Sequence, residues 1–428
     1  MNLAEKKAIF GWSIYDWANS AFATTVMAGF FPIFFKEYWS YGSDTVVSTA
    51  RLGFANALAG ILIALFAPLL GAVADKGGVK KKFLFLFTLI GIMMTSSLYL
   101  VSKGNWPLAV MLYVFAVVGF SGGNIFYDAL LVCVSPIKKI DFVSSLGYAF
   151  GYLGGGILFG INVWMTLNPT YFGLENVQQA VRVSFISVGI WWFVFSLPLL
   201  IFVKEDTAAK TNSYLVIIKG GLIQLKETIQ QIRYLKTILL FLLAYWFYID
   251  GVGTIIRMAV DYGISIGFKS KDLIFALLIT QFVGFPAAIV FGYIGGKLGA
   301  RGSIFIAIMI YLLITFWGVF MRSSYEFYIL AVAIGMVQGG IQALSRSLYA
   351  TLIPDKRSAE FFGFYNMVGK FSAIMGPLLV GSIALLAKYF GFSNSAASRL
   401  SIGSISIFFI VGGILLFFVD ENKSKKEN

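Results

Sequence analysis

The sequence predicts an all-α integral membrane protein with twelve transmembrane helices, arranged as two six-helix bundles related by pseudo-two-fold symmetry. Three observations lead to this prediction. Of the 428 residues, 59% are apolar or aromatic and 12% are charged, and the mean hydropathy is +0.84. Twelve apolar runs are each long enough to cross a bilayer, which takes roughly 20 residues. A glycine-containing motif that joins two of these runs recurs 221 residues later.

The composition excludes several classes of protein. A soluble domain carries about 25% charged residues, so the chain is neither an ordinary cytosolic enzyme, nor a disordered protein, nor a nucleic-acid binder. It has one cysteine, Cys133, and no histidine, which predicts no disulfide framework, no metal site and no histidine-dependent catalysis. We expect no enzyme activity, no cofactor and no nucleic-acid partner. The expected partners are the lipid bilayer and a small-molecule substrate.

The apolar runs divide the chain into two halves. They lie at about 9–35, 50–74, 83–102, 107–133, 141–167, 181–203, 236–261, 272–296, 302–321, 326–352, 361–388 and 398–419. The long link after the sixth run carries Leu and Ile at helical spacing among charged residues, which predicts an amphipathic helix at the membrane interface. We therefore expect an N-terminal bundle (1–203), a cytoplasmic linker (204–235) and a C-terminal bundle (236–428).

Basic residues predict the orientation. With the N-terminus inside, 21 of the 33 Lys and Arg residues lie on cytoplasmic segments, nine on the opposite side and three within the runs. This bias follows the positive-inside rule. We expect a multi-pass protein of the cell (inner) membrane, a monomer with both termini cytoplasmic. Most of the net charge of +13 then reflects topology rather than a polyanionic partner.

The repeated motif links the second and third runs and again the eighth and ninth. The shared positions are Gly71, Lys76, Gly78 and Lys80 in the first copy, and Gly292, Lys297, Gly299 and Arg301 in the second. The glycines allow a tight turn between helices, and the bases anchor it on the cytoplasmic side. Two halves of the same orientation, with a substrate path between them, are typical of a rocking transporter.

This motif resembles the loop signature of the major facilitator superfamily, and the resemblance extends over essentially the whole chain. In that superfamily the acidic residue of the motif, here Asp75, helps to latch the two halves on the cytoplasmic side. The second copy has Gly296 in its place, so we expect an asymmetric latch. The residues that this resemblance assigns to the gate or latch are Gly71, Asp75, Lys76, Gly78 and Lys80.

Charged residues within the runs are the candidates for function, because a charge in the bilayer core costs several kcal/mol and usually faces a cavity or a partner. With the polar residues that share their helical faces, or that the repeat aligns with them, they form the candidate substrate-binding or coupling set. These are Asp16, Asn19, Asn124, Asp128, Tyr148, Asp250, Arg257, Gln338, Gln342, Arg346, Asn366 and Lys370. Asp128 and Arg346 are offset by 218 residues, nearly the repeat, and they suit a gating ion pair as well as substrate contact.

Four longer blocks are more specific than the loop motif. They are Tyr15 to Phe22, Asp250 to Ile255, Gln338 to Ser347, and Phe361 to Tyr365 with Lys370. Together they resemble the branch of the superfamily that includes the fungal autophagy-related vacuolar amino-acid effluxers and their bacterial relatives. The resemblance implies a twelve-span secondary transporter with amino-acid efflux as its activity.

The leading functional hypothesis is secondary active transport of a small polar or zwitterionic solute, an amino acid above all, by alternating access. A proton is the candidate coupling ion. Arg346 or Lys370 would bind the carboxylate of a zwitterion, and Asp250 or Asp16 its amine. The alternative is a broad exporter of amphiphilic or drug-like compounds, with a mainly apolar cavity. A receptor or scaffold predicts a substantial soluble domain, and an enzyme a clustered acid, base and nucleophile; the sequence has neither.

Overall fold

The computed structural model describes residues 3–43, 45–205, 220, 222–227, 235–265, 268 and 270–420. All regular structure in these ranges is helical, and eleven of the helical rods in them are long and apolar enough to cross a membrane. Helix α13 (Ser358–Tyr389) adds a rod of 32 residues that includes the apolar stretch Leu378–Tyr389. The predicted all-α membrane fold is confirmed.

The helices follow one another with short connections. The remaining elements are α1 (Leu3–Ala21), η1 (Phe22–Phe30), α2 (Phe31–Phe34), η2 (Phe35–Trp39), α3 (Thr45–Gly77), α4 (Lys80–Ser97), η3 (Leu98–Leu100), α5 (Trp106–Val134), η4 (Ile137–Lys139), α6 (Ile140–Leu167), η5 (Pro169–Phe172), α7 (Val177–Phe202), α9 (Lys236–Ser265), α10 (Ser270–Leu298), α11 (Ala300–Phe320), α12 (Ser324–Leu352), η6 (Asp355–Arg357), α14 (Asn394–Gly403) and α15 (Ser406–Phe417).

The first spanning rod is longer than its predicted run and is not α-helical throughout. It extends from Leu3 to Trp39, with π-helical segments at η1 and η2. In a π-helix each N–H bonds to the carbonyl five residues back, so side chains four or five apart align. Four apolar residues with that spacing are buried in one cluster: Phe22, Val26, Phe31 and Phe35.

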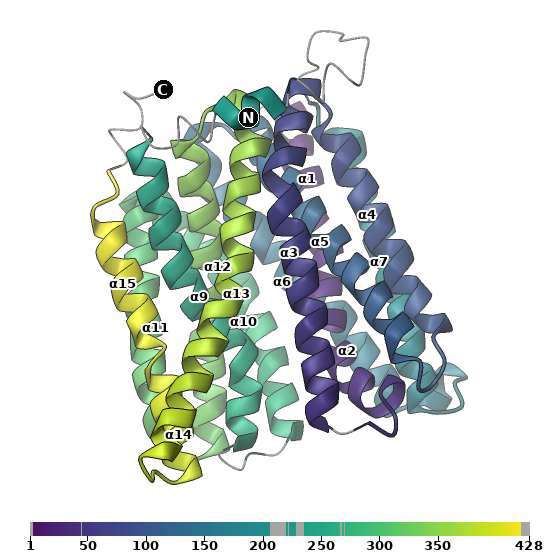
Figure 1. The fold of residues 1–428 in the computed structure, drawn as a ribbon. Coiled ribbons are helices and arrows are strands. Elements are labelled where there is room, and N and C mark those ends of the chain that lie inside the picture. Colours follow the sequence, from purple (N-terminus) through teal and green to yellow (C-terminus); the bar gives the residue numbers. More distant parts are fainter. Residues whose placement is uncertain are drawn as a thin grey trace. The chain divides into compact units, whose positions relative to one another are not determined.

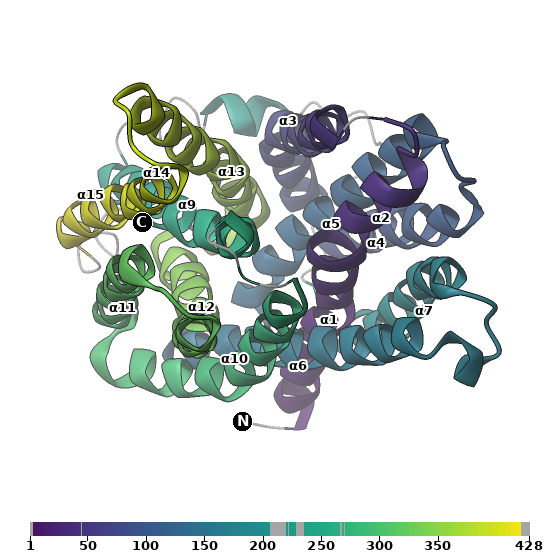
Figure 2. The same ribbon diagram turned by 90° about the horizontal axis from the view of Figure 1, so that it is seen from below.

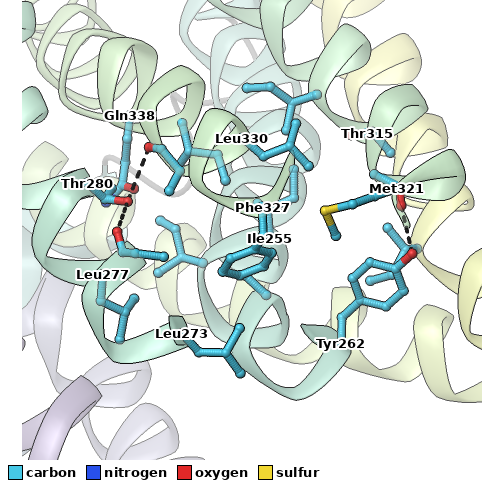
Figure 3. Close-up of a pocket in the computed structure, with 18 residues that line it drawn as sticks. Ile255, Tyr262, Leu273, Leu277, Thr280, Thr315, Met321, Phe327, Leu330 and Gln338 are labelled. Carbon is cyan, nitrogen blue, oxygen red and sulfur yellow. Dashed lines mark hydrogen bonds between the residues drawn. The ribbon is translucent and has the colours of Figure 1, made fainter. Parts of the chain in front are cut away.

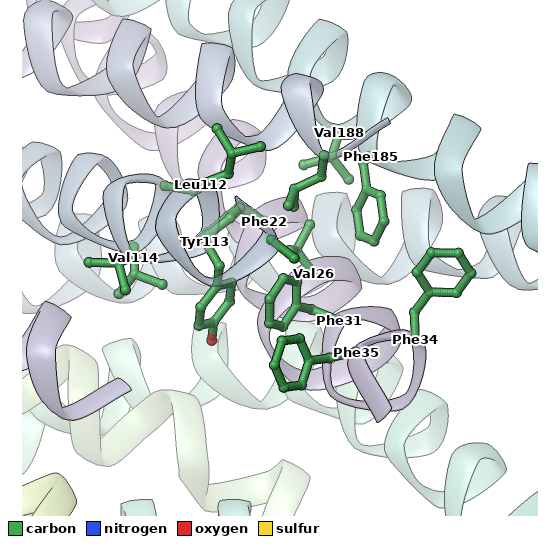
Figure 4. Close-up of a cluster of buried hydrophobic side chains, with 14 of the residues drawn as sticks. Phe22, Val26, Phe31, Phe34, Phe35, Leu112, Tyr113, Val114, Phe185 and Val188 are labelled. Atoms are coloured by element: carbon green, nitrogen blue, oxygen red, sulfur yellow. The ribbon is translucent and has the colours of Figure 1, made fainter. Parts of the chain in front are cut away.

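Aromatic rings fill the cluster around this rod (Figure 4). Phe31 stacks on Tyr113 of α5 with ring centroids 3.9 Å apart, and Phe22 stacks on Trp192 of α7 at 5.5 Å. Lipid tails are as apolar as these rings, so the stabilisation comes from close van der Waals packing rather than from removal of water.

The last predicted run is divided into two helices. Helix α14 ends at Gly403 and α15 begins at Ser406. Two serine hydroxyls near the break, of Ser401 and Ser404, donate to carbonyl oxygens three residues back. Hydroxyls that bond to the backbone in this way bend helices, and glycine adds to the effect.

The described chain groups into two compact units. The first contains residues 1–135, 150–223 and 357–366, and the second contains 136–149, 224–356 and 367–428. In the first unit α4 packs against α5 and α7, and in the second α10 packs against α12 and α15 against α9 (Figures 1 and 2). Each unit therefore combines most of one half of the sequence with the first turns of one helix, α13 or α6, from the other half.

The predicted central linker falls largely outside the described residues. Residues 206–219, 221 and 228–234 are not described, so the amphipathic helix and the division at 204–235 stay predictions. The short described stretch 222–227 is helical.

Candidate functional site

The predicted latch residue Asp75 meets the start of α13. Its carboxylate accepts hydrogen bonds from the backbone N–H groups of Ala359, at 3.1 Å, and Glu360, at 2.8 Å. The first N–H groups of a helix lack partners within the helix and form the positive end of its dipole. The side chain of Asp75 is only 1% exposed, so it acts as a buried anionic cap of α13.

Lys80 completes this cluster from the first turn of α4. Its Nζ lies 2.9 Å from Asp75 Oδ1 and 2.8 Å from Ser358 Oγ. One turn away, Arg357 pairs with Glu360 at 3.1 Å. The predicted latch residue Lys76, in contrast, is exposed and takes no part in these hydrogen bonds.

Two glycines of the motif make this approach possible. A Cβ on Gly71 would overlap the carbonyl oxygen of Ala359, so only glycine lets α3 come this close to α13. Gly78 has φ +58°, in the left-handed region that glycine adopts at little cost, and it turns the chain between α3 and α4. Its counterpart in the second copy, Gly299, also has a positive φ, of +80°.

Glu205 is a functional candidate that the sequence did not reveal. Its two carboxylate oxygens accept the backbone N–H groups of Lys80, at 2.6 Å, and Lys81, at 3.1 Å. Lys81 in turn donates through Nζ to the carbonyl oxygens of Leu200 and Val203 at the end of α7. Each helix end therefore caps the other, and Glu205 positions the backbone of the lysine that binds Asp75. An acid directly after the sixth run, facing a basic loop, was the available signal.

Replacing Glu205 with alanine should lower the free energy of unfolding by about 1–2 kcal/mol, because two N–H groups of α4 lose their cap. Glu205→Asp should lose less. Thermal melting of the purified protein measures this loss. Glu227→Ala, at an exposed position in 222–227, is the matched control and should melt like the wild type. A Glu205→Ala melting curve that coincides with this control would contradict the capping role.

The second copy of the motif is built differently. Gly292 of α10 lies against α6, where a Cβ would come within 2.8 Å of Ser145 Cβ. Gly296, at the position of Asp75, has no heavy atom within 4 Å of where its Cβ would lie. The second copy therefore has no acidic residue at the position where the first copy has Asp75.

A cation from α12 contacts α6 in that region instead. Arg346 is 2% exposed and donates through Nε to Ser144 Oγ, at 2.9 Å, and through Nη2 to the Ser144 carbonyl, at 2.8 Å. Its guanidinium lies 4.5 Å from the ring centroid of Tyr148, which is cation–π geometry. Beside it, Ser347 donates to Asp141 at 2.5 Å.

The two units thus share a related arrangement with opposite charge. In the first unit Asn366 of α13 donates to Asp128 of α5 at 3.0 Å. Asp128 and Arg346 are 218 positions apart, and Ser144 and Asn366 are 222 apart. In each unit a charged residue of α5 or α12 therefore binds a polar residue in the first turns of α13 or α6.

A polar face joins α1 to α5 within the first unit. Asn19 donates to Asn124 Oδ1 at 2.7 Å, and the Tyr127 hydroxyl donates to the carboxylate of Asp16 at 3.2 Å. Trp12 donates to the Tyr127 carbonyl at 2.8 Å and stacks on its ring. Asp16 remains half-buried. Tyr127 was not among the predicted residues, although it lies between Asn124 and Asp128 on the same turn of α5.

Asp250 is fully buried between α9 and α13. Its Oδ1 accepts the backbone N–H of Gly376 at 3.0 Å and the hydroxyl of Thr254 at 3.4 Å. The side chains of two other predicted residues, Arg257 and Lys370, lie outside the described part of the structure.

The α12 amides adjoin an apolar cavity of about 90 Å³ in the second unit (Figure 3). Gln342 donates to the carbonyl of Gln338, and Gln338 lines the cavity. Three other polar side chains of the lining donate to backbone carbonyls: Tyr262 to Gly318, Thr280 to Ala276 and Ala331, and Thr315 to Tyr311. The cavity therefore offers mainly apolar surface.

Comparison with solved structures identifies the fold. The structure of FucP, a major facilitator superfamily transporter in an outward conformation, matches with a TM-score of 0.70, covering 97% of this chain and 98% of that chain at 12% identity. The fold is thus that of the major facilitator superfamily.

Sequence comparisons identify the family. The family model described as "Vacuole effluxer Atg22 like" matches residues 43–428. The "Uncharacterized MFS-type transporter YxiO" of Bacillus subtilis is 39% identical over 96% of this chain and 95% of its own length. Autophagy-related protein 22 of Eremothecium gossypii is 24% identical, covering 89% and 86% of the two chains. The chain belongs to the Atg22-like family of major facilitator superfamily transporters.

Proposed function

We propose that this transporter exports amino acids by alternating access. The observation that carries the proposal is the half-buried carboxylate of Asp16, held by the Tyr127 hydroxyl on the polar face between α1 and α5. A carboxylate at membrane depth is costly unless it serves a partner or a cavity. Held in place in this way, it suits the ammonium group of an amino acid. The family name, vacuole effluxer, supports the direction.

Arg346 and Lys370 are the two candidate ligands of the substrate carboxylate. The guanidinium of Arg346 contacts Ser144 and Tyr148, so we propose Arg346 as a gate residue rather than a substrate ligand. Lys370 is then the proposed cationic partner of the carboxylate. Asp250, bound to the backbone of α13, is proposed as a residue that positions this helix.

The proposed gate consists of the two clusters at the first turns of α13 and α6. Alternating access by rocking requires contacts between the two halves of the sequence to form and break in turn. Asp75 with the α13 N-terminus, and Arg346 with Ser144, are contacts of this kind. Their opposite charges support the asymmetric latch expected from Gly296.

The experiment is uptake of labelled amino acids into proteoliposomes. Asp16→Asn keeps the shape of the side chain and removes its charge, so the initial rate should fall at least about tenfold, the effect of losing one charge-assisted hydrogen bond. Asp355→Asn, at an exposed position in η6, is the matched control and should transport at the wild-type rate. Amino-acid transport that is equally fast with Asp16→Asn would contradict the site.

Three further properties belong to this proposal. A proton is the proposed coupling ion, since Asp16 and Asp128 are carboxylates within the spans; a dependence of uptake on an imposed pH gradient tests it.

The proposed location is the cell membrane, with both termini cytoplasmic and one chain per transporter. The distribution of basic residues supports this orientation. We propose no catalytic step.

The apolar cavity favours a second candidate, export of amphiphilic compounds. Sites for drug-sized ligands have volumes of about 300–1,000 Å³, whereas this cavity measures about 90 Å³, so we rank this function second. Stabilisation of the purified protein by lipophilic cations but not by amino acids would reverse that ranking.

A further inference from the structure

A larger cavity, of about 540 Å³, opens in the first unit at the end of α4 opposite Lys80. Its walls come from the end of the first spanning rod, from the segment after α4, from the end of α6 and from the start of α7. The volume lies within the range of small-molecule sites, about 300–1,000 Å³. Of the predicted site residues whose side chains the structure describes, none lines it.

Four charged side chains surround this cavity: Glu37, Lys103, Glu175 and Arg182. Within the described part of the chain none of the four forms an ion pair, although two are acids and two are bases. Acidic and basic side chains that share one cavity without pairing with each other can bind a ligand that carries both a positive and a negative group. A ligand with a net charge would meet two groups of its own sign.

The two cations are held in place by their surroundings. Arg182 donates through Nε to the Tyr99 carbonyl at 2.7 Å, and its guanidinium lies 4.9 Å from the Tyr99 ring centroid. The Nζ of Lys103 lies 3.5 Å from the ring centroid of Tyr41. These contacts leave the terminal nitrogens of Arg182 as donors for a carboxylate. They also reduce the entropy lost when a ligand binds.

Apolar side chains complete the cavity. Phe34 and Val181 are 6% and 7% exposed and contribute to its lining, together with Phe30 and Ile33. The cavity thus combines an apolar surface with an acidic and a basic pair, which is the complement of an amino acid with an apolar side chain.

We propose that this cavity binds such a zwitterionic amino acid, with its carboxylate at Arg182 and Lys103 and its ammonium group at Glu37 and Glu175. The choice of solute rests on the proposed function. The site itself is additional to the Asp16 face, because it lies at the far end of the unit, where an exported solute would leave.

The test is the binding of L-leucine to the purified full-length protein by isothermal titration calorimetry, with L-glutamate and L-lysine for comparison. Glu37→Gln and Lys103→Gln change exposed side chains. Each should weaken leucine binding about tenfold, the effect of one hydrogen bond to a charged group. Lys36→Gln, next to Glu37 but outside the lining, is the matched control. Leucine should bind more tightly than either charged amino acid.

The outcomes separate this site from the proposed function. Amino-acid transport with unchanged leucine affinity in both variants overturns the site and leaves the function standing. Leucine binding that both variants weaken, without any amino-acid transport, supports the site and overturns the function. Displacement of leucine by phosphatidylethanolamine added to the micelles would assign the cavity to a lipid headgroup and overturn the proposal.

Discussion

Asp75→Ala should lower the free energy of unfolding by about 3–5 kcal/mol, the loss typical of breaking a buried ion pair from one side. Lys80 would keep its charge in a site where its side chain is 9% exposed, and the first N–H groups of α13 would lose their acceptor. Thermal and denaturant unfolding of the purified protein, followed by tryptophan fluorescence, measures this loss. Because the same contacts form the proposed latch, the uptake rate should fall as well.

A double-mutant cycle separates this interaction from general damage. Lys80→Ala alone should also destabilise the protein, and the combination with Asp75→Ala should cost clearly less than the sum of the two losses, because the second substitution removes the uncompensated charge. Lys76→Ala, next to Asp75 in the last turn of α3 but exposed, should stay within about 0.5 kcal/mol of the wild type. Strict additivity of the two substitutions would show that Asp75 and Lys80 do not interact.

Gly376→Ala should be comparably damaging, although it adds a single methyl group. The new Cβ would overlap the Thr254 hydroxyl and lie 2.8 Å from Asp250 Oδ1, so α13 must move away from α9. Overpacking costs about 1–3 kcal/mol, and a buried carboxylate that loses a hydrogen bond costs about 1–3 kcal/mol more. We expect a loss of about 2–6 kcal/mol in stability, measured by the same melts.

Gly381→Ala is the matched control, since Gly381 lies on the same helix and no heavy atom of the described residues is within 4 Å of where its Cβ would lie. It should leave stability unchanged or raise it by up to about 1 kcal/mol, as alanine does in a helix. Combining Gly376→Ala with Thr254→Ala should restore part of the loss. Equal melting temperatures for the two glycine variants would disprove the close contact between α9 and α13.

The fold could be predicted because the sequence features that indicate it occur along the whole chain. Apolar runs of bilayer length and a motif repeated after 221 residues need no tertiary information, and the family model and the match to FucP bear out the superfamily. The run 9–35 was harder: the rod extends beyond it at both ends, and its π-helical segments η1 and η2 were not predicted.

Within the candidate site, the residues that stand out most in the sequence are those that are costly in a membrane. Asp16, Asp128 and Arg346 stand out because charges are rare in spans. Two of their partners, Asn366 and Tyr148, were also among the predicted residues, but Tyr127 and Ser144 were not. Tyr127 and Ser144 are ordinary residues of apolar helices, and only the fold brings them to Asp16 and Arg346. Glu205 was missed for the same reason, since its partners are backbone N–H groups 124 and 125 residues away.

The inclusion of the α13 start in the first unit has a consequence for biosynthesis. Asp75 meets the backbone of Ala359, which is 284 residues further along the chain. At about 5–20 residues per second, the ribosome adds that segment roughly 15–60 s later. Until that segment is synthesised, Asp75 and Asp128 lack their α13 partners. Translation of the C-terminal half therefore sets the time at which the N-terminal half completes its own structure.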